Sequence, residues 1–266
     1  MITLKDDKPN LMIENGKLQA ESFSDTPYVF QNIHTLGHRA RYTAEHLVQL
    51  NRSAQELFGE QLPANITAKV IEQQIEELLT SNRLTRNTSI RVEIRLNAIG
   101  DYSLRYYEPS LYAGYVMRSL QPEAICLPVD MPLPQHPTSA SAATRLLADA
   151  IARQRGYHTA IIAERDGGVA IEPNAPLFCI KEYTMVAQEG CHSVESDLVI
   201  AAARAIGLTI ERKRLMTSDL KYADEVFSAN WQGITAIAHI GQQPYMSILA
   251  EKIAHQMERA AQNNDN

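Results

Sequence analysis

The sequence predicts an α+β protein of two domains, and three observations support this. Apolar residues recur at helical spacing in several segments, whereas strict apolar and polar alternation marks others as strands. A proline-rich stretch divides the chain near its middle. Because 266 residues suffice for two domains of ordinary size, we expect domains over residues 1–120 and 121–266, without internal repeats.

Composition and charge exclude several classes of partner. The formal net charge is -6, and no basic stretch is available to neutralise a nucleic-acid backbone. No apolar run approaches the roughly 18 residues that span a bilayer. The three cysteines lack the spacing of metal ligands and fit a reducing compartment. We therefore expect a soluble, cytoplasmic protein without disulfides, which binds neither nucleic acid, membrane nor metal.

Two amphipathic helices are predicted in the first half. Thr43 is a good N-cap residue, and apolar residues follow it at helical spacing until Gly59. Asn65 can cap a second helix, whose apolar stripe continues at intervals of three and four residues to Leu79. Each helix is therefore expected to bury one face.

The strands of the first half follow these helices. Residues 90–96 alternate between apolar and charged side chains, which is typical of a half-buried strand. Gly100 and Asp101 can reverse the chain, so residues 102–107 and 115–117 supply further strands of an antiparallel sheet. The charged positions of the first strand, which we expect to face solvent, are Arg91, Glu93 and Arg95.

A stiff linker and a second set of elements are predicted beyond residue 120. Five prolines between residues 121 and 137 are too many for a helix or a central strand. Asp166-Gly167 is a hairpin signal between a strand over 159–164 and one that starts at Val169. The other expected elements are helices over 144–155, 196–206 and 247–261 and a strand over 177–180.

Several short strings occur in a fixed order over almost the whole chain. They are Val29-Phe30-Gln31, Glu45 to Leu50, Gly168-Val169, Leu177-Phe178, Ile206 to Arg212, Asp219 to Phe227 and Gly233-Ile234. In this order they resemble the class IV aminotransferase family, the fold-type IV enzymes that use pyridoxal phosphate (PLP). That family includes branched-chain and D-amino-acid aminotransferases and aminodeoxychorismate lyase, and residues 230–234 resemble the lyase-like branch most. The resemblance implies the two-domain D-amino-acid aminotransferase-like architecture, a homodimer and a cofactor cleft between the domains.

The resemblance also implies a lysine that forms an imine with the cofactor. The family places it about 18 or 19 residues before the glycine that ends the following helix. Counting back from Gly156 reaches Pro137 or Thr138, and no lysine occurs between Lys69 and Lys181. Thr138 therefore stands at the Schiff-base lysine position.

The phosphate contacts implied by the resemblance are replaced as well. Gln49 stands where the family has a phosphate-binding arginine. The phosphate-binding Gly-Ile-Thr-Arg motif at a helix start corresponds to Ser193-Val194-Glu195-Ser196. A carboxylate at Glu195 would repel the phosphate by about 4 kcal/mol per charge pair at about 4 Å. Alternatively, Glu195 is simply a stabilising charge at the positive end of the helix.

Two further positions differ from the family. Ile171 stands at the glutamate that contacts the pyridine nitrogen, and Glu172 follows it on the opposite face of a strand. Glu172 could take this role only if a bulge turned it around. Trp231 replaces a small residue beside the phosphate, where it could fill the vacated space or bind a different flat ligand.

We therefore predict an aminotransferase-like protein that has lost PLP catalysis, with the cofactor absent or weakly bound and no catalytic residue assigned. Its interdomain cleft is expected to bind an unknown small molecule or a protein partner. One alternative is an active PLP-dependent aminotransferase or lyase-like enzyme acting on amino acids. Another is an enzyme that performs different chemistry in the same cleft.

Overall fold

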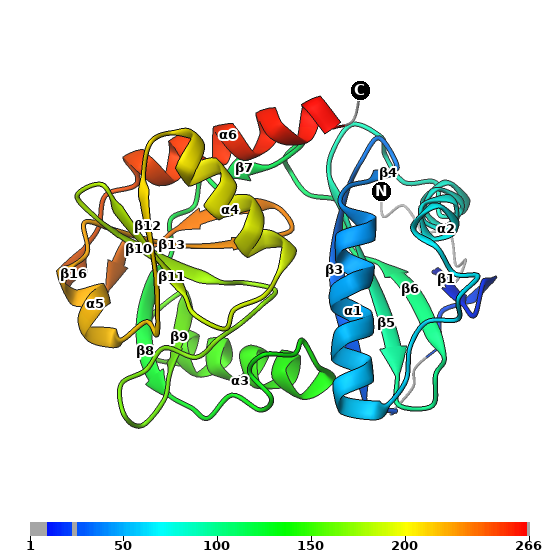
Figure 1. Ribbon diagram of the computed structural model, residues 1–266, viewed down its shortest axis with the longest axis horizontal. Coiled ribbons are helices and arrows are strands. Elements are labelled where there is room, and N and C mark those ends of the chain that lie inside the picture. The colour runs from blue at the N-terminus through cyan, green and yellow to red at the C-terminus, as the bar shows by residue number, and fades with distance from the viewer. Residues whose placement is uncertain (1–9, 23–25, 265–266) are drawn as a thin grey trace, which may run out of the picture. The chain divides into compact units, whose positions relative to one another are not determined.

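The computed structural model describes residues 10–22 and 26–264, and it divides into two compact units (Figure 1). The first unit covers residues 1–110 and the second covers residues 111–266. The boundary between them lies at Ser110 and Leu111, earlier in the chain than the expected 120/121.

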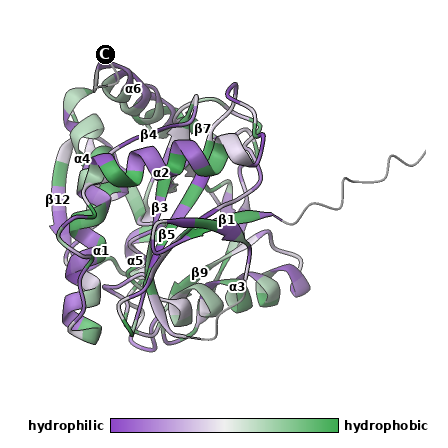
Figure 2. Ribbon diagram, turned by 90° about the vertical axis from the view of Figure 1, so that its right-hand side faces the viewer, coloured by the Kyte–Doolittle hydropathy of each residue, from purple (hydrophilic) through white to green (hydrophobic). Residues whose placement is uncertain are grey.

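The first unit is built on a six-stranded antiparallel sheet in the order β2-β1-β6-β5-β3-β4. Its strands are β1 (Leu11–Glu14), β2 (Lys17–Ala20), β3 (Tyr28–Leu36), β4 (Arg39–Ala40), β5 (Ile90–Asn97) and β6 (Tyr102–Tyr106). The helices α1 (Thr43–Phe58) and α2 (Ala68–Ser81) pack their apolar sides into one core with the sheet. The alternating hydropathy along α2 is visible in Figure 2.

The predicted helices of this unit are present, but their first residues differ from expectation. Thr43 is the first helical residue, and the N-cap is Tyr42, which has a positive φ of 56° and no side-chain cap bond. In α2 the hydroxyl of Thr67, rather than Asn65, accepts a hydrogen bond from the backbone of Val70. Asn65 instead lies within a turn, because the next residue donates its backbone N–H to the Pro63 carbonyl at 2.8 Å.

The charged side of β5 was predicted to face solvent, but it is largely covered. Glu93 is only 5% exposed and pairs with the guanidinium of Arg95. The Arg95 guanidinium lies 4.4 Å from the Tyr28 ring centre, and the Arg91 guanidinium lies 3.5 Å from that of Tyr107. Alternation along a strand identifies which side chains share a face, but the neighbouring elements decide whether that face is covered.

The second unit contains two sheets, in the orders β12-β11-β10-β13-β14-β7 and β16-β15-β8-β9. The larger sheet comprises β7 (Val116–Met117), β10 (Leu177–Lys181), β11 (Thr184–Gln188), β12 (Thr209–Lys213), β13 (Glu225–Asn230) and β14 (Gly233–Ala236). The smaller sheet comprises β8 (Glu123–Pro128), β9 (Thr159–Ala163), β15 (His239–Ile240) and β16 (Gln243–Pro244). The helices are α3 (Ser139–Gln154), α4 (Val194–Ala205), α5 (Thr217–Tyr222) and α6 (Ile248–Asn264).

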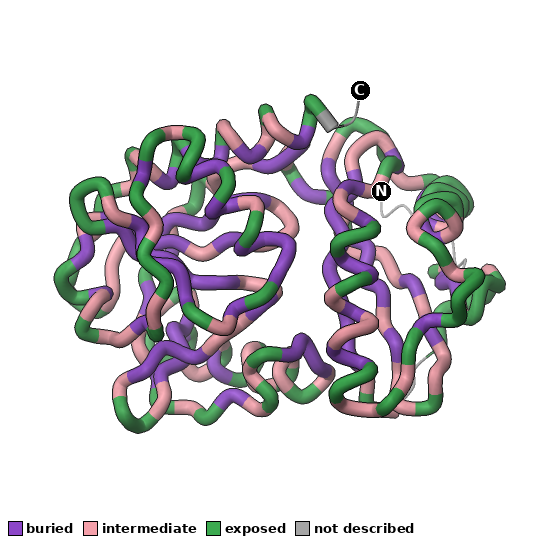
Figure 3. Tube along the Cα trace, in the orientation of Figure 1, coloured by how far each residue is buried: buried purple, intermediate pink, exposed green. Residues whose placement is uncertain are grey.

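Apolar side chains join these layers. One cluster links Ala124 and Ile161 of the smaller sheet to Cys179 and Val226 of the larger sheet. A second cluster packs α3 against β8 and β9, and the helices α4 and α6 contact each other and the larger sheet. The buried course of the central strands can be followed in Figure 3. The packed sheets thus form the framework that carries the side chains at their ends.

Part of the predicted linker is a strand, so that prediction was wrong. Strand β8 lies inside the smaller sheet and pairs in parallel with both β9 and β15. The sheet accommodates the prolines because Pro122 precedes the strand and Pro128 ends it, where a ladder N–H is not essential. Residues 116–117 form the expected strand, but this strand pairs in parallel with β14 in the second unit.

Two local predictions in the second unit were partly right. The Asp166-Gly167 turn is confirmed, with a φ of 86° at Gly167 and a 2.7 Å hydrogen bond from the Glu164 N–H to the Gly168 carbonyl. Beyond it, Val169 forms only an isolated bridge to Ala163 rather than starting a strand. The helix expected from residue 144 begins at 139 instead, because Thr138 caps it.

Candidate functional site

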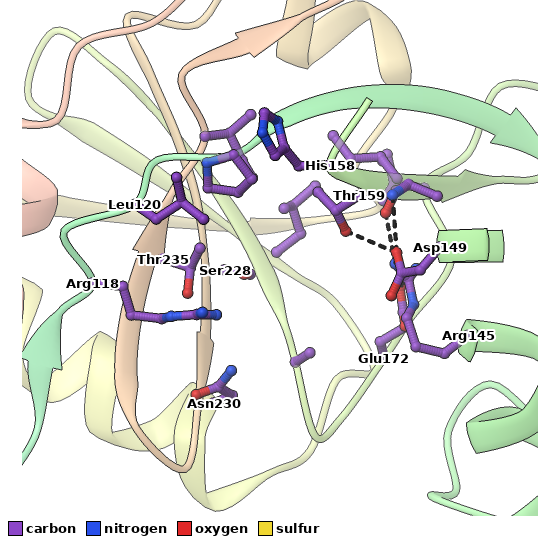
Figure 4. A pocket seen from close by; sticks show the side chains of 17 residues that line it. Arg118, Leu120, Arg145, Asp149, His158, Thr159, Glu172, Ser228, Asn230 and Thr235 are labelled. Atoms are coloured by element: carbon purple, nitrogen blue, oxygen red, sulfur yellow. Dashed lines mark hydrogen bonds and ion pairs between the residues drawn. The ribbon is translucent and has the colours of Figure 1, made fainter. Parts of the chain in front are cut away.

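The second unit holds a cavity of about 430 Å³ (Figure 4). Side chains from α3, β9, β10, β13 and β14 line it, together with residues just before β8. Two polar walls stand on opposite sides of the cavity in Figure 4, and apolar side chains lie between them. Each wall is built by a different set of elements.

The first wall is an ion-pair cluster on α3. Arg145 donates to both Glu172 carboxylate oxygens at 2.8 and 2.5 Å and to the Ala160 carbonyl at 2.6 Å. Asp149 lies one helical turn later on the same face, where its Oδ1 accepts from Thr159 Oγ1 at 2.8 Å. The Ala160 backbone N–H also donates to Asp149 Oδ1, at 3.0 Å.

The cluster perturbs the titration of Glu172. Burial raises the pKa of Glu172, and the neighbouring positive charge of Arg145 acts in the opposite direction. The bidentate geometry is the one in which a guanidinium binds a carboxylate most strongly. We therefore regard Arg145 and Glu172 as an ion pair that is engaged before any ligand arrives.

The second wall carries polar groups whose hydrogen-bonding capacity is only partly used by the described residues. Arg118, just after β7, makes no side-chain hydrogen bond or ion pair with any described residue. The Thr235 hydroxyl is buried and has no hydrogen-bond partner in the part of the chain that the structure describes. Ser228 pairs directly with Thr235 across β13 and β14, and Asn230 uses its carbonyl oxygen to accept from the Gln232 backbone. This wall can therefore donate several hydrogen bonds to a ligand.

Thr138, predicted at the Schiff-base position, has a structural role at the start of α3. Its side chain is buried, and its hydroxyl accepts from the Ser141 backbone N–H at 3.0 Å. The Ser141 hydroxyl accepts in turn from the Thr138 backbone N–H at 2.9 Å, which completes a capping box. None of the four lysines of the second unit lines the cavity. They are Lys181, Lys213, Lys221 and Lys252.

Ile171 and Glu172 point in opposite directions, as the alternation of an extended segment predicts. The Ile171 side chain lies 3.6 Å from where a Cβ atom on Gly190 would stand. Glu172 faces Arg145 in the cavity, so no bulge turns it to the side of Ile171. The Ile171 side chain itself is aliphatic and accepts no proton.

Glu195 differs from both readings of it made from the sequence. It occupies the first turn of α4, is only 2% exposed, and its Oε2 has no hydrogen-bond partner within residues 10–22 and 26–264. Burial raises its pKa to about 8, so the carboxyl is mostly neutral at pH 7. Neither a repelling carboxylate nor a stabilising negative charge is therefore present at that pH. Ser193 caps this helix by accepting from the Ser196 N–H at 3.1 Å.

The remaining predicted cofactor positions lie apart from the cavity lining. Val194 is a buried aliphatic residue beside Glu195, and Trp231 is half-buried in the turn between β13 and β14. Gln49 lies on α1 of the first unit, and its buried Oε1 accepts no hydrogen bond from any described residue. Of the seven predicted positions only Glu172 lines the cavity.

Sequence reasoning missed most of the polar residues of the cavity. The four-residue spacing of Arg145 and Asp149 on a predicted helix was a usable signal for an ion pair. Arg118 gave no signal, because its position depends on the pairing of β7 with the distant strand β14. In the described ranges no cluster of three metal-ligating side chains occurs, and none of the described helices could cross a membrane.

Comparison with known proteins identifies the family. The sequence pattern of the amino-transferase class IV family matches residues 29–240. The chain belongs to this family. No protein with a curated function matches the sequence significantly.

Solved structures of class IV aminotransferases share the fold. The branched-chain aminotransferase from Thermoproteus uzoniensis with norvaline is 18% identical, with a TM-score of 0.78 over 96% of each chain. The T.th. enzyme complexed with N-(5'-phosphopyridoxyl)-L-glutamate is 18% identical, with a TM-score of 0.74 over 96% of this chain and 95% of that one. The Escherichia coli enzyme is 16% identical, with a TM-score of 0.73 over 92% of each chain.

These likenesses confirm the predicted α+β fold-type IV architecture, in the form found in branched-chain aminotransferases. The T.th. enzyme has also been solved with pyridoxamine 5'-phosphate. At sequence identities below 20%, these structural likenesses show the fold of this chain, whereas function depends on the side chains at the site.

Proposed function

We propose that this class IV aminotransferase homologue has lost PLP-dependent catalysis and serves as a noncatalytic binding protein. The observation that carries the proposal is the residue at the Schiff-base position. Thr138 offers a hydroxyl that is engaged in the cap of α3, and residues 70–180 contain no lysine at all. Without an amine there, the cofactor has no covalent anchor, and no lysine is available to move a proton at the substrate carbon.

The positions predicted to hold the phosphate do not fit a dianion. At the start of α4, Val194 brings an aliphatic side chain, and Glu195 brings a buried carboxyl in place of a hydroxyl donor. A neutral Glu195 donates at most one hydrogen bond, and an ionised one repels the phosphate. Gln49 carries no positive charge where the family has an arginine.

The position predicted to hold the pyridine nitrogen does not fit either. Ile171 has no acceptor for the ring proton, and both oxygens of Glu172 are occupied by Arg145. Turning Glu172 toward a cofactor would break its bidentate pair with the Arg145 guanidinium and leave only Asp149 beside that charge, which costs free energy at a partly buried site. We therefore derive no reaction step through PLP for this chain.

Spectroscopy of the purified protein tests the proposal. We expect no imine absorbance band in the wild type, either as purified or after titration with PLP. The variant Thr138→Lys restores the amine, with Thr138→Ser as the control that keeps the cap. We expect no imine band in Thr138→Lys, because the phosphate and ring-nitrogen positions remain unsuited. A phosphopyridoxyl group fixed by borohydride on any wild-type residue and found by mass spectrometry would refute the proposal.

An active PLP enzyme is the alternative function, and the shared fold favours it. The T.th. structures with PLP-derived compounds are examples of this fold with the cofactor chemistry in place. Transamination of branched-chain amino acids by the purified chain, dependent on added PLP, would favour this alternative. We also propose a homodimer, which light scattering tests independently of any activity.

A further inference from the structure

We propose that the cavity of the second unit binds a small organic molecule with a single carboxylate group. Arg118 and the side chains of Ser228, Asn230 and Thr235 would hold the carboxylate. The four residues that would hold the carboxylate lie outside the predicted cofactor positions, although Glu172 of the opposite wall is one of those positions. The proposal does not rest on the loss of PLP chemistry.

Arg118 provides the positive charge. Its backbone N–H donates to the Ile234 carbonyl at 2.9 Å, which fixes the residue beside β14. Its side chain extends into the cavity toward Ser228 and Asn230 (Figure 4). Because no described residue supplies a carboxylate partner, the guanidinium is available to form a bidentate ion pair with the carboxylate of a ligand.

Hydrogen-bond donors surround this charge. Ser228 and Thr235 are direct cross-strand neighbours, so their side chains share one face of the larger sheet. The Thr235 hydroxyl is buried and finds no hydrogen-bond partner among the residues of the described ranges, which costs free energy until a ligand accepts its hydrogen bond. The Asn230 side-chain NH₂ makes no hydrogen bond with the described residues, because only its oxygen is used, by Gln232.

The opposite wall limits the charge of the ligand. Asp149 and Glu172 bring two negative charges and Arg145 brings one positive charge, so Arg118 makes the charged lining neutral as a whole. A dianion such as a phosphate ester would add a second negative charge to a cavity that already holds two carboxylates. A monocarboxylate places only one negative charge there, beside Arg118. Asp149 Oδ2 forms no hydrogen bond with the described residues, so it can accept one from a hydroxyl on the ligand.

The space between the walls suits an apolar body. Leu120, Pro122, Ile161, Leu177 and Ile237 line it, and about 430 Å³ lies in the lower part of the range of small-molecule sites. Leu120 is 58% exposed, so the cavity reaches the surface there. A carboxylate at one end, an apolar middle and a hydroxyl at the other end would match the cavity.

Calorimetric titration with 3-(4-hydroxyphenyl)propanoate tests this proposal. Three related probes separate its parts: 3-phenylpropanoate lacks the hydroxyl, 3-(4-hydroxyphenyl)propan-1-ol lacks the carboxylate, and phenyl phosphate is a dianion. We expect the hydroxylated carboxylate to bind most tightly. We expect the alcohol and phenyl phosphate each to bind at least about tenfold more weakly.

Variants locate the site. We expect Arg118→Gln to weaken binding of the carboxylate about tenfold or more and Thr235→Val to weaken it about fivefold. The matched control is Arg165→Gln, which removes an exposed arginine of the same unit and leaves affinity unchanged. Amide shifts in NMR spectra of each variant verify that the unit remains folded.

The proposal is overturned if neither carboxylate saturates the protein, if phenyl phosphate binds more tightly than the carboxylates, or if Arg118→Gln binds like the wild type. Absorbance of the same samples reports any PLP. A yellow protein that carries PLP as an imine would therefore contradict the proposed function. An unchanged affinity of Arg118→Gln for the carboxylates would contradict only this inference.

Discussion

The starts of α3 and α4 are two helix N-termini at predicted cofactor positions, and they differ in how their polar groups are satisfied. At α3, Thr138 and Ser141 satisfy each other in a reciprocal cap. At α4, Ser193 caps the backbone, but Glu195 is buried beside it with an unpartnered oxygen. The α3 terminus is therefore built as ordinary structure, whereas the α4 terminus keeps a buried acid that lowers stability once ionised.

The pH dependence of stability gives the largest expected difference between the two termini. The pKa of Glu195 is about 8 in the folded chain against 4.5 ordinarily, so the folded state holds its proton more tightly. The protonated Glu195 carboxyl therefore favours the folded state. This contribution to the free energy of unfolding is fully present below pH 4.5 and is lost as the pH rises through about 8. The loss amounts to about 1.4 kcal/mol per pH unit over this interval, which is several kcal/mol in all.

The substitution Glu195→Gln tests this by removing the titrating group. We expect the wild type, but not Glu195→Gln, to lose free energy of unfolding between pH 5 and pH 9 in urea denaturation. The matched control Asp197→Asn changes an exposed acid in the same helical turn and should keep the wild-type pH dependence. Parallel curves for wild type and Glu195→Gln would contradict a buried, protonated Glu195.

The ion-pair cluster farther along α3 gives the next largest effect. Arg145→Met removes the guanidinium and leaves Glu172 and Asp149 facing each other without a positive charge. Because these side chains keep about a fifth of their surface exposed, we expect a destabilisation of about 2 kcal/mol, below the value for fully buried pairs. The double variant Arg145→Met with Glu172→Gln should recover part of this loss. No recovery would show that Arg145 contributes mainly through packing.

The caps themselves give the smallest effect and sharpen the comparison. Thr138→Ala removes one half of a reciprocal cap, and we expect it to cost about 1 to 2 kcal/mol of unfolding free energy. Ser193→Ala removes a single cap bond and should cost about 0.5 to 1 kcal/mol. Thr144→Ala, within α3, is the control for losing a threonine and should be nearly neutral. Thermal unfolding measures all three, and equal losses at both caps would argue against a stronger cap at α3.

Several elements could be predicted from local sequence. The apolar spacing of α1 and α2, the alternation in β5 and the Asp166-Gly167 turn each depend on residues close together in the chain. Strand β8 could not be predicted, because its prolines resemble a linker until the pairing with β9 and β15 is known. Parallel pairing joins segments that are distant in sequence and leaves no local pattern.

The candidate site, like the fold, has some features that the sequence predicts and others that it does not. The predictions that the Schiff-base lysine is missing and that Gln49, Ile171 and Glu195 replace cofactor contacts depend on the order of motifs along the chain. The cavity of Arg118 and Thr235 does not, because β7, β13 and β14 bring these residues together only in the folded unit. Nor could the protonation of Glu195 be predicted, since burial sets its pKa.

By itself, the sequence determined the two-part α+β organisation, the resemblance to class IV aminotransferases and the lack of any lysine between Lys69 and Lys181, from which the missing amine is predicted. The tertiary structure alone decided which polar groups are satisfied. It paired Glu172 with Arg145, buried one Glu195 oxygen without a hydrogen-bond partner among the described residues and left Arg118 facing a cavity. The physical reason is that hydrogen bonding and desolvation depend on neighbours supplied by distant segments, whereas periodicity and motif order are properties of the chain alone.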